Sequence, residues 1–272
     1  MPEAEREAQE GGFRPARRYP SAAPEKCVTL LTLAAMRPHL LFSRVGEVGH
    51  RRLFGLPLLA ALAVAACAEP KVSLATGPRE YVPTDYPQVL KKWTRNENLI
   101  VLSELSDELN VTATYESWDF RWAYVIRYAA DYRLTIDQRH ELLEHTLQET
   151  ANDHEFYVTL YGTSWRWLDL SRPTSAWIVR LIDDQGSETA PARIESIPKP
   201  GPLEYRYFPF TTVWRRVFRI RFPRQAPDGR PTIANNARWF GLRFAGAAGN
   251  EELRWLVESS ADRVATFGDR AP

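Results

Sequence analysis

The chain has 272 residues, of which 25% are charged and 44% hydrophobic, so it is long enough for one large domain and too apolar for wholesale disorder. Its formal net charge of +1 argues against a nucleic-acid partner. Residues 1–66 hold nine of the 35 Lys/Arg and six of the 34 Asp/Glu, which leaves the other 206 residues with a net charge of −2. All nine tryptophans also lie in those 206 residues, which marks them as the folded part.

Residues 48–66 have the layout of a secretory signal peptide. Arg51 and Arg52 form a basic start, a 12-residue apolar run extends from Leu53 to Val64, and two alanines follow. A transmembrane helix is the alternative, but the uncharged run has 16 residues. As a helix it would span about 24 Å against roughly 30 Å of hydrocarbon. We therefore predict a cleaved leader.

The end of this leader resembles the lipobox of bacterial lipoproteins, because Val64-Ala65-Ala66-Cys67 gives an aliphatic residue, two small residues and a cysteine. The resemblance implies cleavage between Ala66 and Cys67, a diacylglycerol on the Cys67 thiol and an acylated amino group. Several acyl chains are what stable anchoring requires. Ala68 follows, and by the sorting rules of well-studied bacteria a residue other than Asp favours the outer membrane. We expect a lipid-anchored protein of the cell envelope, facing the periplasm.

The stretch before the leader is longer than a signal peptide needs. Secretory signals usually have about 15–30 residues, whereas 66 precede the lipobox cysteine. Residues 1–25 are rich in Ala, Glu, Arg and Pro without a period, which is typical of disorder. We expect residues 1–47 to be a disordered or wrongly assigned extension, with translation starting at Met36, Val45 or Val48.

Residues 67–83 predict a lipidated tether, because Pro and Gly recur there without periodicity. One domain is then expected over residues 84–262, followed by a disordered tail over 263–272. Its first elements are a helix with apolar residues at helical spacing from Tyr86 to Trp93 and a short strand over Asn98–Leu102.

A helical hairpin is predicted as an insertion over residues 118–152. Ser117 is a plausible N-cap for a helix over Trp118–Tyr132. A second helix begins after Thr135, whose spacing to Gln138 is that of a capping box. The link between the two helices is short, which predicts an antiparallel pair.

The rest of the domain predicts β-structure, since short alternating segments are separated by turn residues. The expected strands are Leu109–Tyr115, Glu155–Tyr161, Ser175–Ile182, Ala192–Ile197, Val213–Phe222, Arg238–Phe244 and Glu252–Val257. This pattern predicts an α+β fold, an antiparallel β-sandwich that is immunoglobulin-like in style, with the helical hairpin inserted.

A catalytic centre is hard to find. His140 and His145 lie five residues apart, about 140° around a helix, so they do not form the zinc motif that needs two histidines four apart. His154 has the parity of a partly buried strand residue. We predict no metal site and no cofactor, and the catalytic residues, if any, are unknown. A hydrolase using the His140–Glu155 region is one alternative function.

Acidic and basic residues are concentrated in different parts of the mature chain. Residues 101–160 carry a net charge of −8, and residues 205–254 carry a net charge of +7. Arginines and tryptophans interleave in the basic stretch, and guanidinium groups suit carboxylate and phosphate partners. The candidate ligand-binding residues are Arg215, Arg219, Arg221, Trp214 and Trp239. They predict either a site for an anionic glycan or lipid, or an arginine face covered by the acidic helices of the same domain; we favour the second.

Several short stretches of the mature chain look like a family of uncharacterised bacterial lipoproteins. They are Lys92-Trp93-Thr94-Arg95, Val111-Thr112-Ala113-Thr114-Tyr115, Phe120, Ala123-Tyr124 and Trp239-Phe240. The resemblance brings no activity and no site residues. The leading expectation is a non-enzymatic structural or interaction protein, whose partners are the membrane through its lipid and an envelope protein.

Overall fold

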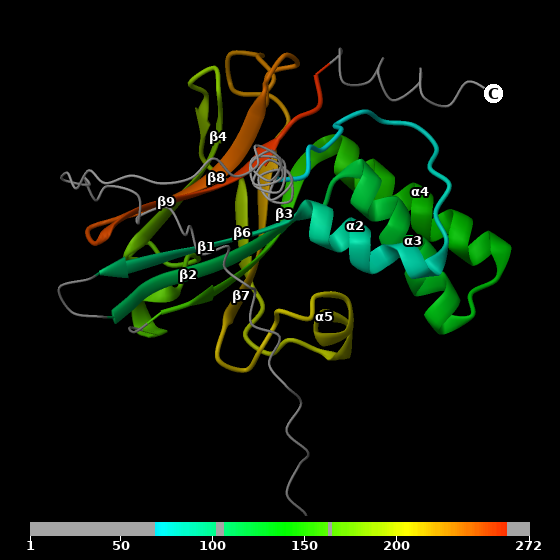
Figure 1. Ribbon diagram of the computed structural model, residues 1–272, viewed down its shortest axis with the longest axis horizontal. Coiled ribbons are helices and arrows are strands. Elements are labelled where there is room, and N and C mark those ends of the chain that lie inside the picture. Colours follow the sequence, from blue (N-terminus) through cyan, green and yellow to red (C-terminus); the bar gives the residue numbers. More distant parts are fainter. Residues whose placement is uncertain (1–68, 102–105, 163–164, 260–272) are drawn as a thin grey trace, which may run out of the picture. The chain divides into compact units, whose positions relative to one another are not determined.

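Two antiparallel sheets and a set of helices make up the part of the chain that the computed structural model describes, residues 69–101, 106–162 and 165–259 (Figure 1). The predicted α+β class is confirmed. In sheet order, the first sheet contains β1 (Thr94–Val101), β2 (Ser106–Tyr115), β3 (Asp153–Tyr161), β7 (Arg216–Pro223) and β6 (Arg193–Ser196). The second contains β5 (Glu188–Thr189), β4 (Trp177–Asp183), β8 (Trp239–Gly246) and β9 (Gly249–Leu256).

The described helices are α2 (Tyr86–Trp93), α3 (Trp118–Tyr132), α4 (Ile136–Asn152) and α5 (Pro202–Tyr207). The predicted helical hairpin is confirmed, and α3 and α4 lie in the chain between β2 and β3. The Ser117 hydroxyl accepts a hydrogen bond from the Phe120 N–H and caps α3. Thr135 and Gln138 form the predicted capping box at the start of α4.

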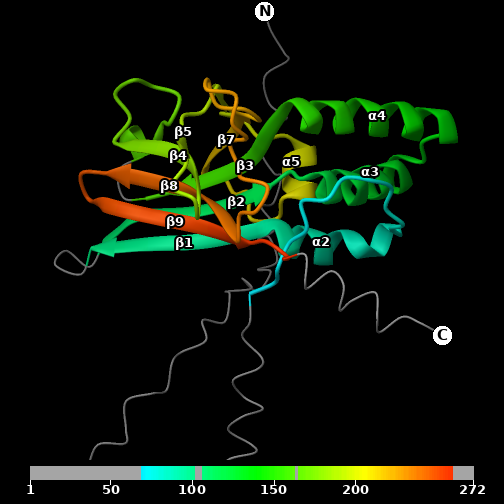
Figure 2. The same ribbon diagram turned by 90° about the horizontal axis from the view of Figure 1, so that it is seen from above.

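The three longer helices lie at one end of the first sheet (Figures 1 and 2). Chain connectivity requires this arrangement, because α2 runs directly into β1, β2 is followed closely by α3, and α4 runs directly into β3. β7 is antiparallel to β3 and therefore ends at this helical end and begins at the opposite one. One end of the first sheet therefore carries the helices, and β3 ends and β7 begins at the other.

Aromatic side chains from both sheets share one hydrophobic core. The Tyr115 ring of β2 lies 5.2 Å from the Phe240 ring of β8, and the Phe156 ring of β3 lies 5.6 Å from Trp255 of β9. Trp255 is fully buried and donates from its indole N–H to the carbonyl of Trp93, 2.9 Å away. Each pair of aromatic rings in contact contributes about 0.5–1.5 kcal/mol to stability beyond the burial of its area.

Three local predictions were wrong or incomplete. The strand expected at Asn98–Leu102 begins at Thr94, immediately after α2, where the backbone turns extended. The six-residue α5 was not predicted, because Pro202 at its first position gives no periodic signal over so short a length. The two-residue strand β5 is likewise too short for alternation to reveal.

The segment before α2, where a lipidated tether was predicted over residues 67–83, packs against the domain at Val72. Val72 is fully buried and forms a parallel bridge with Val257, just after β9. Its N–H donates to the Leu256 carbonyl at 2.7 Å, and its carbonyl accepts from the Glu258 N–H at 2.8 Å. The Pro and Gly residues of this segment disfavour a long helix, but they do not prevent it from pairing with the edge of a sheet.

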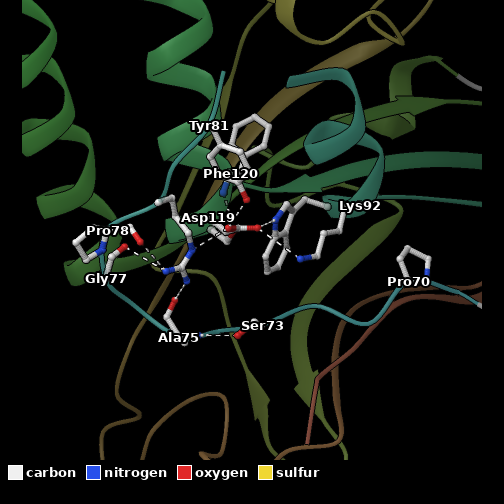
Figure 3. Close-up of polar contacts among 12 residues, drawn as sticks. Pro70, Ser73, Ala75, Gly77, Pro78, Tyr81, Lys92, Asp119 and Phe120 are labelled. Carbon is white, nitrogen blue, oxygen red and sulfur yellow. Dashed lines mark hydrogen bonds and ion pairs between the residues drawn. The ribbon is translucent and has the colours of Figure 1, made fainter. Parts of the chain in front are cut away.

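Asp119, on the first turn of α3, fixes the same segment from the other side (Figure 3). Its carboxylate accepts hydrogen bonds from Arg79 at 3.1 Å, from the Tyr81 hydroxyl at 2.6 Å and from the Trp93 indole at 3.0 Å. The Lys92 ammonium lies 3.6 Å away. Burial alone would raise the pKa of Asp119, but these hydrogen bonds and Lys92 together lower it, so the carboxylate stays ionised.

Candidate functional site

The predicted arginine face lies under the helices at one of its two ends. Arg221, on β7, places its Nε 3.4 Å from a carboxylate oxygen of Glu155 and its Nη2 4.0 Å from Glu149 of α4. Arg215, just before β7, donates to the hydroxyls of Thr112 and Thr159 at 3.2 and 3.3 Å. The helices therefore cover the Arg221 end of the basic face, whereas Arg215, at the other end of β7, contacts hydroxyls of two strands.

A buried charge cluster forms where α3 crosses this face. It consists of Glu116, Arg121 and Glu155, which are each at least nine-tenths buried, together with Arg219 and Arg221 of β7. One nitrogen of Arg121 lies 2.9 Å from both glutamates. Burial raises the pKa of Glu116, whereas the negative charge of Glu116 raises the pKa of Arg219. The cluster holds the hairpin on the sheet and leaves no open arginine surface at this point.

The candidate tryptophans are not brought together. Trp214 lies just before β7, at the end of the first sheet far from the helices, and is 72% exposed. Trp239 begins β8 and pairs with Leu256, beside the segment before α2 and so near the helical end. The Arg254 guanidinium lies 4.4 Å from the Trp239 ring centre. One ligand site using all five predicted residues is therefore not present.

An exposed aromatic surface, which we call the aromatic ledge, occupies the end of the first sheet opposite the helices. β3 ends there and β7 begins there, with Leu160 paired to Arg216. The ledge consists of Tyr161, Trp165, Trp167, Val213 and Trp214, whose exposed fractions run from 43% to 72%. The contact between Arg216 and Trp165 places Trp165 beside the start of β7, close in the chain to Trp214. Exposed apolar side chains that lie close together favour a contact site.

Arg216 holds part of the ledge in place. Its guanidinium lies 4.7 Å from the centre of the Trp165 ring, and its Nε donates to the Trp165 carbonyl at 3.0 Å. Another of its nitrogens lies 3.2 Å from Asp169. Trp165 and Trp167 belong to a short 3-10 helix, Trp165–Leu168, which exposes both rings. The sequence signal for this surface is the Trp-Arg-Trp triplet of residues 165–167.

The histidines of the proposed hydrolase region do not converge. His140 pairs with Glu144 at 3.1 Å on the exposed side of α4, whereas His154 is buried at the start of β3. Within residues 69–101, 106–162 and 165–259, no three His, Cys, Asp or Glu side chains gather as metal ligands would. No helix in this part of the chain has the length and apolarity to cross a bilayer. The lipobox residues Ala66 and Cys67 lie outside it, as do residues 1–47, the leader and the predicted tail.

Comparison with known proteins gives little. No family model matches the chain, and no curated protein matches it. A solved structure from Burkholderia pseudomallei, described as a novel protein of unknown function, is similar at 12% identity with a TM-score of 0.32. The match covers 72% of this chain and 99% of the Burkholderia pseudomallei chain. The resemblance to uncharacterised bacterial lipoproteins therefore stays a prediction.

Proposed function

We propose that this chain is the precursor of a lipid-anchored protein of the bacterial cell envelope, whose folded domain acts by contacting another envelope protein and not by catalysis. The observation that carries the anchor is the Val64-Ala65-Ala66-Cys67 sequence directly after the apolar leader. The outer membrane, on its periplasmic side, is the proposed location.

Packing of the segment after Cys67 supports a domain held close to the membrane. Arg95 donates to the carbonyl of Pro70 at 3.2 Å, so the chain is fixed three residues after the lipidated cysteine. Three residues span at most about 10 Å. The anchor end of the domain would then lie near the headgroups, with little free chain between lipid and protein.

The aromatic ledge lies at the other end of the strands from this attachment. Eight residues of a strand such as β7 rise about 26 Å. The ledge would consequently face away from the anchoring bilayer and towards the periplasm. Trp, Tyr and Arg are the residues enriched in the energetic centres of protein interfaces. These features favour a protein partner; an anionic glycan that stacks on the same rings is the second candidate.

We also propose that the two sheets pack face to face as an antiparallel, immunoglobulin-like sandwich. Ring contacts between Tyr115 and Phe240 and between Phe156 and Trp255 support this arrangement. An experimental structure in which these rings lie in separate cores would overturn it.

Replacement Cys67→Ser is expected to abolish the incorporation of labelled fatty acid and to leave an uncleaved precursor, because the thiol is the acylated group and processing follows acylation. The measurement is metabolic labelling with an alkyne palmitate analogue, followed by mass spectrometry of the N-terminal peptide. Ala68→Ser, which keeps the lipobox cysteine, is the matched control and should label and mature normally. Normal maturation of the Cys67→Ser protein would contradict the lipoprotein assignment.

A photo-crosslinking amino acid in place of Trp214 is expected to give a discrete protein adduct in intact envelopes, because the ledge is the proposed partner surface. Ile136, 76% exposed on α4 at the other end of the sheet, is the control position and should give none. Trp214→Ala should alter the free energy of unfolding by no more than about 0.5 kcal/mol, since the ring buries little. Equal adducts at both positions, or none at 214, would argue against a protein partner at the ledge.

A further inference from the structure

A polar cavity of about 650 Å³ opens beside the start of β3, where the segment before α2 and the chain after β9 meet. His154 and Arg224 line it from the first sheet. Ser73 comes from the segment before α2, and Asn235 and Asn236 from the loop before β8. The volume is within the range of about 300–1,000 Å³ that is typical of small-molecule sites. The cavity is separate from both the aromatic ledge and the buried charge cluster.

Hydrogen bonds fix which nitrogen of His154 carries its proton. Tyr115 is fully buried, and burial raises the pKa of its hydroxyl, so the hydroxyl keeps its proton. The Tyr115 oxygen lies 2.7 Å from His154 Nδ1. No other hydrogen-bond acceptor contacts this hydroxyl in the described part of the chain, so its proton points to Nδ1. Burial and the charge of Arg224 lower the pKa of His154 to about 3, so the ring is neutral and Nε2 bears its hydrogen.

Arg224 brings an uncompensated positive charge to the same wall. One of its terminal nitrogens donates to the Thr150 carbonyl, whereas its Nε is buried and has no hydrogen-bond partner. No carboxylate within the described ranges forms an ion pair with it, in contrast to Arg238, which also lines the cavity but lies 2.9 Å from Asp184. Glu258 is the one carboxylate among the lining residues. The cavity is therefore lined by a guanidinium that has no carboxylate partner in the described part of the chain.

We propose that this cavity binds the phosphate group of a small organic molecule, with Arg224 as the charge partner and the Nε2–H of His154 as a neutral donor. A phosphate offers acceptor oxygens in several directions, which suits donors that come from different walls. The amides of Asn235 and Asn236 provide further donors. The cavity exceeds the size of a free phosphate, so the bound group belongs to a larger molecule. This site is independent of lipidation and of the ledge.

The test is a titration of the full-length, detergent-solubilised protein with inorganic phosphate and, separately, with short-chain phosphatidylglycerol, followed by calorimetry at pH 7. Arg224→Gln and His154→Asn should each weaken binding by about tenfold or more, since a hydrogen bond to a charged group contributes about 1.5–3 kcal/mol. The matched control Arg139→Gln, on the exposed side of α4, should bind as the wild type does. Asn in place of His154 can still accept from Tyr115 but has no Nε2–H.

The two probes distinguish the source of the phosphate. Tighter binding of phosphatidylglycerol than of inorganic phosphate identifies a lipid headgroup, and comparable binding identifies a soluble phosphate compound. Nuclear magnetic resonance of the wild-type protein provides a second test, in which the ¹⁵N resonance of His154 Nε2 should shift at saturating phosphate. Failure of both probes to bind, an unmoved His154 resonance, or unchanged affinity in folded Arg224→Gln and His154→Asn proteins would each overturn the proposal.

Discussion

Replacement Arg121→Met is expected to lower the free energy of unfolding by about 3–5 kcal/mol, the usual cost of removing one partner from a buried ion pair. Arg121 is the group shared by Glu116 and Glu155, with contacts of 2.9 Å to each. One oxygen of each glutamate is already buried without a partner. Without the guanidinium, two carboxylates would remain in the interior beneath α3. Urea denaturation followed by circular dichroism measures the loss.

Arg127→Met, on the same helix, is the matched control. Arg127 pairs with Asp131 at 3.0 Å, but both side chains are about one quarter exposed, so the expected loss is at most about 1 kcal/mol. Glu116→Gln in the Arg121→Met background should recover part of the stability, because it removes one of the two buried negative charges. Equal losses in the Arg121 and Arg127 variants would show that the buried charge cluster does not hold the hairpin.

The helical hairpin could be predicted because its signals are local. Ser117 and Thr135 stand at the N-caps, and each side chain bonds to a backbone N–H three residues further on. The buried faces of α3 are less easily read from the sequence. Phe120, Ala123, Val125 and Ala129 are all buried, and they do not fall on one helical stripe. A helix with a sheet on one side and another helix on the other buries more than one stripe, and periodicity alone does not reveal that.

Charge balance predicted the partner of the arginine face, but not its geometry. Opposite net charges in residues 101–160 and 205–254 indicated that the two stretches would meet, and Arg221 does meet Glu155 and Glu149. The shared position of Arg121 between two glutamates depends on strands and a helix far apart in sequence. No spacing in the chain encodes such a contact.

The segment before α2 and the cavity beside it were not predictable for the same reason. Val72 is held by the strand edge near Val257, more than 180 residues away. His154 was expected to be partly buried from its strand parity, and the structure buries it almost completely. Its partners Tyr115 and Arg224 come from two other strands or their ends, so neither the cavity nor the orientation of the ring could be inferred.

Acidification is expected to destabilise the domain through His154 by about 3 kcal/mol between pH 7 and pH 4. The folded pKa is about 3, because burial and the charge of Arg224 oppose protonation. The unfolded value is about 6.5. Below about pH 6.5, His154 is protonated in the unfolded chain but stays neutral in the folded protein. The free energy of unfolding therefore falls by about 1.4 kcal/mol per pH unit until the folded pKa is reached.

His154→Asn isolates this contribution, because Asn keeps an acceptor for Tyr115 but does not titrate. Its free energy of unfolding should depend less steeply on pH than that of the wild type, and the two curves should converge or cross as the pH falls from 7 to 4. Phosphate-free buffers separate this effect from ligand binding. Asp119 has a lowered pKa, so its contribution is lost only at more acidic pH and is common to both proteins. Parallel curves would mean that His154 is readily protonated in the folded state, and the Nε2–H assignment in the cavity would then lose its basis.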